Sequence, residues 1–380
     1  MRIAVPREKQ PGEARVALVP ESVKKLVAAG VEIGIETGAG QRAGFSDKDY
    51  EAAGASVMSR SDLLPEADIL VGVNRPEEDD FSRLKKGAVI IGFLKPLDEP
   101  AALETVIARG LTAFAVELVP RTTRAQSMDA LSSMATIAGY KAVIIAAERL
   151  PRMFPLLMTA AGTVPPAKVL VLGAGVAGLQ AIATARRLGA VVEAYDVRAA
   201  AGQDVKSLGA KFLEVDLGGI ETQDAGGYAK ELSPEALQRG RDMVAKHAAT
   251  SDVVITTAQV PGRKAPLMLT EESVNNMKTG AIIIDLAATT GGNVAGTKAG
   301  EEVQHNGVTI LGPLNLPGSV PFHASQLYSR NLTSFIALLH DKGTLKIDMN
   351  DDILKGACVT YQGNNVHPKV AAALGHPVAQ

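Results

Sequence analysis

The chain has little cysteine, no tryptophan and no excess of charge of either sign. The single cysteine, Cys358, cannot form an intrachain disulfide, which indicates a reducing compartment. The 39 Lys and Arg residues against 41 Asp and Glu residues leave a formal charge of −2, so the basic footprint of a nucleic-acid-binding protein is missing. The 6 histidines show no ligand spacing. We therefore expect neither a nucleic-acid partner nor a metal site.

Long hydrophobic runs are also missing. Apolar stretches such as residues 142–147 are much shorter than the roughly 18–20 residues that cross a bilayer. At the N-terminus, Pro6 and the charged residues 7–9 interrupt the apolar start too early for a signal or transit peptide. We expect no membrane span of the chain's own.

Short apolar runs alternate with helical patterns in two regions of the 380-residue chain. The runs of the first region are residues 3–5, 32–36, 69–73, 89–93 and 112–117, and those of the second region are 169–172, 191–195, 211–215, 253–257, 282–285 and 309–311. Apolar runs without polar alternation are typical of parallel strands covered by helices on both faces. The pattern predicts an α/β fold with two Rossmann-like, doubly wound parallel-sheet domains.

Two long helical patterns, at residues 126–150 and 324–340, join these regions, and residues 159–166 have the composition of a loop. The tail after the second pattern is too short to form a domain, so we expect it to return to the first one. The predicted first domain is therefore discontinuous, with residues 1–126 and 321–380. Residues 127–320, including the bridging helix, form the predicted dinucleotide-binding domain, and a cofactor cleft is expected between the domains.

A glycine-rich turn, Gly173-Ala174-Gly175-Val176-Ala177-Gly178, follows the strand-like residues 168–172 and opens a helical pattern. In this context the first glycine permits a tight turn, the second lets the backbone approach a pyrophosphate, and the third allows close packing of helix and strand. The amides around Val176 and Ala177 lie at a helix N-terminus, which attracts phosphate. The turn predicts a dinucleotide site.

The strand that follows this turn ends at Asp196, with Val197 and Arg198 next. An acid about 20 residues beyond the glycines accepts the adenine ribose hydroxyls and disfavours a 2′-phosphate. Arg198 is open to two interpretations, since a nearby arginine tolerates NADP(H) but a solvated turn residue has no such role. We favour NAD(H) over NADP(H).

Two further segments have the composition of ligand loops. Residues 120–129 concentrate polar groups before the bridging helix; Asp129 and Ser132 share a helix face, and Gln126 precedes the first turn. The alternative is that Ser127 caps the helix and the arginines are solvated. Residues 216–228 are too long and glycine-rich for an ordinary connection and indicate a mobile flap.

Nearly end to end, the chain resembles the soluble NAD(H)-binding component of proton-translocating nicotinamide nucleotide transhydrogenase, which is the N-terminal piece of its alpha subunit. The segments that carry the resemblance are residues 124–129, 158–167, 173–184 and 226–231. It implies that Arg121, Gln126, Asp129 and Ser132 surround the nicotinamide, with Gln126 as the catalytic residue that orients the ring, and that Gly227, Tyr228 and Gln259 also contact the nucleotide. Without the resemblance, Tyr228 is interpreted equally well as a surface aromatic.

The resemblance also implies the partners and the reaction. In that family the component forms a homodimer that docks on the NADP(H)-binding domain of the beta subunit, with separate membrane-spanning subunits. NADH held by this component passes a hydride directly to NADP⁺ on the partner, coupled to proton translocation. We therefore expect a cytoplasmic chain, peripheral on the inner membrane.

The alternative family is alanine dehydrogenase, which shares the architecture and an N-terminal pattern present here as residues 6–8 and Arg15. Oxidising an amino acid requires proton transfer. The dehydrogenase's lysine, histidine and acid align with Asn74, Lys95 and residues 289–290 (both Thr), which lack that chemistry. Hydride transfer between two nicotinamides needs only alignment and exclusion of water. A non-catalytic NAD-sensing module is a third hypothesis.

Overall fold

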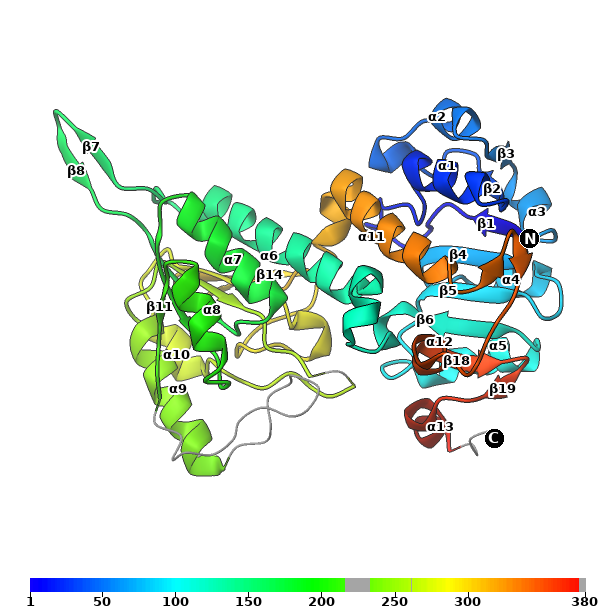
Figure 1. Ribbon diagram of the computed structural model, residues 1–380. Coiled ribbons are helices and arrows are strands. Elements are labelled where there is room, and N and C mark those ends of the chain that lie inside the picture. Colours follow the sequence, from blue (N-terminus) through cyan, green and yellow to red (C-terminus); the bar gives the residue numbers. More distant parts are fainter. Residues whose placement is uncertain (216–232, 261, 376–380) are drawn as a thin grey trace. The chain divides into compact units, whose positions relative to one another are not determined.

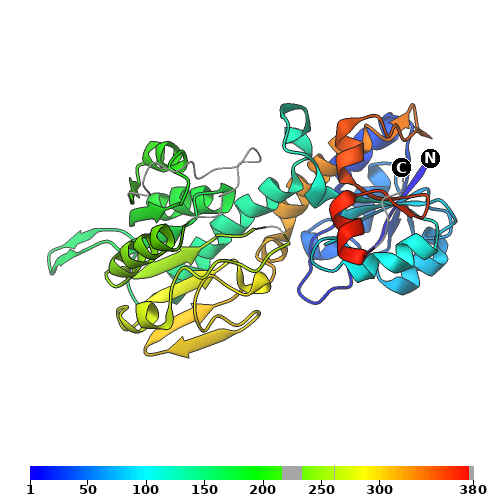
Figure 2. The same cartoon turned by 90° about the horizontal axis from the view of Figure 1, so that it is seen from below.

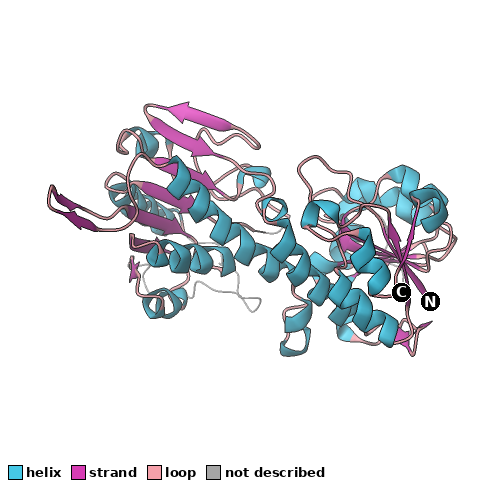
Figure 3. Cartoon of the chain, turned by 90° about the horizontal axis from the view of Figure 1, so that it is seen from above, coloured by secondary structure: helices cyan, strands magenta, loops and turns pink. Residues whose placement is uncertain are grey.

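The computed structural model describes residues 1–215, 233–260 and 262–375, and its backbone divides into two compact units (Figure 1). Unit 1 consists of Met1–Met134 and Pro317–Gln380, and unit 2 of Ala135–Leu316. In each unit helices flank the strands, which Figure 3 distinguishes by colour. The predicted α/β class with two domains is confirmed.

The sheet of unit 1 has the strand order β19-β18-β6-β5-β4-β1-β2-β3 among the described residues. Its strands are β1 (Arg2–Val5), β2 (Glu32–Glu36), β3 (Ser56–Met58), β4 (Ile69–Asn74), β5 (Val89–Phe93), β6 (Thr112–Ala115), β18 (Cys358–Tyr361) and β19 (Asn364–Asn365). The strands β1 to β6 are parallel and follow the 3-2-1-4-5-6 order of doubly wound folds. The C-terminal segment of the chain adds β18, which pairs antiparallel with β6.

Helices and short turns surround this sheet. They are α1 (Pro20–Ala28), α2 (Asp47–Ala52), α3 (Arg60–Leu63), α4 (Glu78–Arg83), α5 (Glu104–Ala108), α11 (Pro321–Ile336), α12 (Asp352–Ala357) and α13 (Pro368–Leu374), with the 3-10 turns η1 (Gln41–Ala43), η2 (Pro100–Leu103), η3 (Val116–Leu118), η4 (Thr123–Met128) and η6 (Pro317–Ser319) and the small strands β16 (His340–Asp341) and β17 (Thr344–Leu345). Phe335 of α11 packs edge-on against Phe114 of β6, and both side chains are fully buried. The helix α11 therefore covers one face of the sheet.

Unit 2 has the strand order β11-β10-β9-β12-β13-β15-β14. Its strands are β9 (Lys168–Leu172), β10 (Val191–Tyr195), β11 (Lys211–Phe212), β12 (Val253–Thr256), β13 (Ile282–Asp285), β14 (Glu302–His305) and β15 (Val308–Leu311), and its helices are α7 (Val176–Arg187), α8 (Ala201–Ser207), α9 (Pro234–Ala248) and α10 (Glu271–Asn275), with the 3-10 turn η5 (Ala288–Thr290). Counted from β9, the parallel strands again follow the order 3-2-1-4-5-6, and β14 closes one edge antiparallel. The two units therefore share one winding, although their sequences show no repeat.

A β-hairpin replaces the loop that was expected at residues 159–166. The strands β7 (Leu157–Thr159) and β8 (Gly162–Val164) pair antiparallel, and each of their residues is exposed. The hairpin extends away from the sheet of unit 2 (Figures 1 and 2). Gly162 has φ = 126°, a conformation that glycine adopts readily, and it follows the turn residues. The sequence did not predict the hairpin because its strands face no core.

The long helix α6 (Ala130–Arg149) contains the boundary between the units. By length and composition it is apolar enough to cross a membrane, which corrects the expectation that every apolar stretch falls short. One such helix is weak evidence, because the core helices of globular proteins pass the same test. Ala142, Val143 and Ala146 are fully buried in the core of unit 2, so this helix serves as a core element.

Candidate functional site

The glycine turn of unit 2 lies at the carboxyl end of β9, where the strand order reverses between β9 and β12. Gly173 has φ = 99°, and a Cβ there would lie 2.5 Å from the Thr257 Oγ1. A Cβ on Gly178 would lie 1.8 Å from the Gly173 carbonyl oxygen. A Cβ on Gly175 would meet nothing within 4 Å. The outer glycines are therefore required by packing, and the middle one leaves open space beside the backbone.

The helix α7 begins directly after Gly175 and has no side-chain cap. Gly175 and Val176 are exposed and Ala177 is half-buried, so the first amides of the helix face the open space. Uncapped N–H groups and the positive end of the helix dipole together bind phosphate well. The open middle glycine and the uncapped helix fit the pyrophosphate of a dinucleotide.

Asp196 follows β10 and is buried. One of its oxygens, Oδ2, accepts the Ala174 N–H at 2.7 Å, so the carboxylate is tied to the glycine turn. It also borders a cavity of about 600 Å³, which is lined by residues including Tyr195, Val197, Gln203, Lys206 and Phe212. A carboxylate between the turn and a cavity of this size is placed as a ribose acceptor should be.

The interpretation of Arg198 as a solvated turn residue is wrong. Its Nε donates to Asp196 Oδ1 at 2.9 Å and its Nη2 to Asp196 Oδ2 at 2.8 Å. The side chain of Arg198 is 22% exposed, and hydrogen bonding to Asp196 raises the pKa of the guanidinium above its ordinary value. Arg198 is therefore a partner of the candidate ribose acceptor.

A buried hub that the sequence analysis did not single out holds the neighbouring loops. Asp285, fully buried at the end of β13, accepts hydrogen bonds from Thr256, Ala287, Asn293, Val294 and Thr297. Asn293 in turn donates to the Ala258 carbonyl at 2.9 Å and accepts its N–H at 3.1 Å. An acid that ends an apolar strand beside the switch point is the sequence signal for such a hub.

Gln259 lies on one of the loops that this hub holds. It is exposed, and its Nε2 donates to the Leu286 carbonyl at 2.8 Å. Gly227 and Tyr228, the two candidates on the predicted flap, lie outside the described residues. No group of three His, Cys, Asp or Glu side chains in the described ranges is arranged to hold a metal ion.

The polar segment 120–129 belongs to unit 1 and precedes α6. Ala125 and Met128 are buried and anchor it, which leaves Gln126 and Arg121 exposed. Asp129 accepts the Ser132 N–H at 2.8 Å and the Ser132 hydroxyl at 2.6 Å. The alternative that Ser127 caps the helix is therefore wrong, since Asp129 does so.

Two contacts from elsewhere in unit 1 fix this segment. Asn331 of α11 donates to the Ser127 carbonyl at 2.9 Å. Arg124 pairs with Asp351 at 2.7 Å and with Asp352, both at the start of α12. The structure thus brings the predicted nicotinamide residues together on one segment whose exposed side chains rest on a fixed backbone.

Unit 1 also holds a closed cluster of buried polar side chains that follows β1 and β4. Arg15 Nε donates to Glu13 Oε1 at 2.7 Å, and Asn74 Nδ2 donates to Glu13 Oε2 and Glu8 Oε2 at 3.0 Å each. Burial raises the pKa of Glu8. Burial acts in the same direction on Glu13, but hydrogen bonds from Arg15 and Asn74 outweigh it and lower that pKa. Arg15 is therefore neutralised inside the protein.

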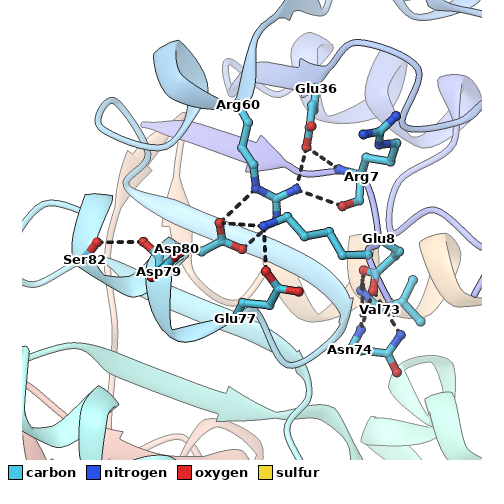
Figure 4. A network of polar contacts seen from close by, with 11 residues as sticks. Arg7, Glu8, Glu36, Arg60, Val73, Asn74, Glu77, Asp79, Asp80 and Ser82 are labelled. Carbon is cyan, nitrogen blue, oxygen red and sulfur yellow. Dashed lines mark hydrogen bonds and ion pairs between the residues drawn. The ribbon is translucent and has the colours of Figure 1, made fainter. Parts of the chain in front are cut away.

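The basic residues beside this cluster are paired as well (Figure 4). Arg60 donates to both carboxylate oxygens of Asp80, at 2.9 and 2.6 Å, and to Glu36 at 2.8 Å. Lys9 donates to Glu77 at 2.7 Å. Lys9 and Arg60 line a cavity of only about 50 Å³. The carboxyl edge of unit 1 at its switch point is thus closed by internal ion pairs.

These features define a class of protein: a two-unit α/β chain in which one unit carries a Rossmann dinucleotide site. The chain belongs to the alanine dehydrogenase/PNT family. The model of that family's N-terminal domain matches residues 4–138, and the model of its C-terminal domain matches residues 142–368.

Relatives from both branches of the family span the whole chain. The first of the two polypeptides that make up an NAD(P) transhydrogenase alpha subunit in Rhodospirillum rubrum is 48% identical over 377 residues, which are 97% of this chain and 98% of the relative. The crystal structure of a transhydrogenase from Sinorhizobium meliloti has a TM-score of 0.89 at 44% identity and covers 96% of this chain and 100% of that one. A solved L-alanine dehydrogenase has a TM-score of 0.84 at 30% identity, with 99% of each chain covered. The resemblance to the transhydrogenase component is confirmed, with alanine dehydrogenase as the more distant relative.

Proposed function

We propose that this chain is the NAD(H)-binding component of a proton-translocating NAD(P)⁺ transhydrogenase and presents NADH to NADP⁺ held by a partner subunit. The observation that carries the proposal is a contrast between the units. In unit 2 the glycine turn is open beside Gly175, whereas in unit 1 the polar cluster around Arg15 is satisfied internally. The chain therefore has a nucleotide site without a free site for a small carboxylic acid beside Arg15.

The reaction fits such a chain because it needs no proton transfer. A C–H bond at C4 of the reduced nicotinamide breaks and a C–H bond at C4 of the oxidised one forms, so both nucleotides are substrates that must be aligned and shielded from water. The first amides of α7 would hold the pyrophosphate and Asp196 the ribose. Arg121, Gln126, Asp129 and Ser132 would hold the nicotinamide end, with Gln126 setting its orientation.

The proposed partners are a second copy of this chain, the NADP(H)-binding domain of a beta subunit and separate membrane-spanning subunits, with this chain peripheral on the cytoplasmic face of the inner membrane. Support for the homodimer comes from the hairpin β7–β8. Leu156, Leu157, Met158 and Val164 are 53%, 38%, 74% and 40% exposed, which is a dense apolar surface for so small an element. A second copy that covers the hairpin would remove this surface from water.

The decisive experiment adds NADH and a chromogenic NADP⁺ analogue to the purified chain together with membranes that contain the partner subunits. We expect nucleotide-to-nucleotide transfer that depends on both the chain and the membranes, and no oxidation of alanine by the chain with NAD⁺. Robust alanine turnover would overturn the proposal in favour of the dehydrogenase. NADH binding without transfer to the analogue would favour the NAD-sensing module.

A further inference from the structure

The acceptor positions of Asp196 are all in use. Its Oδ1 accepts the Arg198 backbone N–H at 2.8 Å and the Arg198 Nε–H at 2.9 Å. Its Oδ2 accepts the Ala174 N–H at 2.7 Å and the Arg198 Nη2–H at 2.8 Å. An ionised carboxylate has about four lone-pair positions. The two hydroxyls of an adenine ribose therefore find no acceptor on Asp196 until a donor leaves.

The four donors differ in how easily they leave. Two of them are backbone amides, that of Ala174 inside the glycine turn and that of Arg198 directly after β10, and neither moves without distorting the turn. The other two belong to the Arg198 guanidinium, which sits at the end of a flexible side chain and is partly exposed. The guanidinium is therefore the donor that the ribose displaces, two bonds for two hydroxyls.

The pairing also changes the charge that a nucleotide meets. While Arg198 is on Asp196, the carboxylate is neutralised and repels a 2′-phosphate only weakly. The displaced guanidinium stays tethered two residues away, beside the cavity that Asp196 and Lys206 line. A cation there offers charge-assisted hydrogen bonds to a 2′-phosphate but gains little from a 2′-hydroxyl.

We propose that Arg198 is a specificity-determining residue of the ribose subsite: its guanidinium is an internal competitor of the adenine ribose, and it reduces the preference for NAD(H) over NADP(H). The proposal rests on the proposed function only in that unit 2 binds NADH. It predicts that removing the guanidinium strengthens NADH binding, which is the opposite of what a direct contact to the nucleotide would do.

The test is calorimetric titration of the full chain and of Arg198→Ala with NADH and NADPH. We expect Arg198→Ala to bind NADH about three- to tenfold more tightly, the range of a partly exposed ion pair, and to bind NADPH more weakly. The gain should persist for ADP-ribose and vanish for reduced nicotinamide mononucleotide, which lacks the adenine ribose. Arg187→Ala, at an exposed position of α7 in the same unit, is the matched control for loss of a cation and should leave both affinities unchanged.

Severalfold weaker NADH binding by Arg198→Ala, or an equal gain for the mononucleotide, would overturn the proposal. Arg198→Lys keeps the charge without the two-pronged geometry, so we expect an intermediate NADH affinity and a retained NADPH affinity. This variant decides the matter if the alanine variant melts at a much lower temperature than the unsubstituted chain. Failure of the unsubstituted chain to bind NADH would instead overturn the proposed function.

Discussion

Glu117 gives the sharpest prediction about how the chain responds to pH. It lies in η3, directly after β6, and its Oε1 accepts the Lys95 N–H at 2.6 Å. Its Oε2 is buried and has no hydrogen-bond partner within the described ranges of the chain. Burial raises the pKa of Glu117 from 4.5 to about 7, and the nearby Asp98 acts in the same direction. The folded protein therefore holds this proton where the unfolded chain releases it.

The sign of the pH dependence follows from that difference. Between pH 4.5 and about 7 the folded state binds more protons than the unfolded state, so the free energy of unfolding falls as the pH rises through this window. Each pKa unit is worth about 1.4 kcal/mol, which places the full penalty above pH 7 at up to about 3 kcal/mol. Glu117→Gln removes the charge and keeps an oxygen that can accept the Lys95 N–H.

We therefore expect Glu117→Gln to stabilise the protein at pH 8, by up to about 3 kcal/mol, and to have almost no effect at pH 5. Urea unfolding at several pH values, followed by circular dichroism, measures the difference between the variant and the unsubstituted chain. Glu104→Gln, which changes an exposed glutamate of α5, is the matched control. A stability difference of the same size at pH 5 and pH 8 would refute the reasoning.

Three further predictions address the site and the assembly. Asp196→Ala should weaken NADH binding by roughly 1–3 kcal/mol in calorimetric titration, because hydrogen bonds to a charged group are lost, and unchanged binding would contradict the ribose assignment. Gln126→Asn should leave NADH affinity near normal but slow transfer to the NADP⁺ analogue in the presence of partner membranes; an unaltered rate would remove its proposed role. Met158→Asp places a charge on the exposed hairpin and should shift sedimentation from dimer to monomer, whereas a dimer that persists would place the contact elsewhere.

The strands that the sequence predicted well are those that a sheet buries on both faces. Residues 32–36, 89–93, 191–195 and 282–285 have the same bounds in the sequence pattern and in the structure. The pattern failed where pairing depends on partners distant in the chain. The edge strands β14 and β18 have no continuous apolar run, and they exist because β15 and β6 offer them an edge. Their position could not be seen in local periodicity.

Turns and ends of elements were also harder to predict than their existence. The expected strand 112–117 ends at Ala115, because residues 116–118 form a 3-10 turn, and the expected strand 211–215 is only Lys211–Phe212. The second long helix begins at Pro321 and ends at Ile336, so it starts and stops earlier than its pattern. Apolar residues continue past such ends, whereas backbone hydrogen bonding stops.

At the site, residue types that force one backbone geometry were predictable and side-chain pairings were not. The glycine turn is specified by its letters, because only glycine fits at Gly173 and Gly178. Nothing in the sequence distinguished a solvated Arg198 from one bound to Asp196, since both are compatible with a turn. The pairing of Arg15 with Glu13 was equally hidden, because two residues separated by one position face each other only in a particular loop.

The way the C-terminal segment of the chain re-enters unit 1 has a consequence for biogenesis. On the ribosome, β6 emerges early, but its neighbour β18 follows only after all of unit 2 has been made. Until then the nascent chain carries an unpaired strand edge, the feature through which proteins aggregate. Unit 2 is contiguous and can complete its sheet first. A chain that stops before residue 358 would keep this edge permanently and should accumulate as insoluble aggregate.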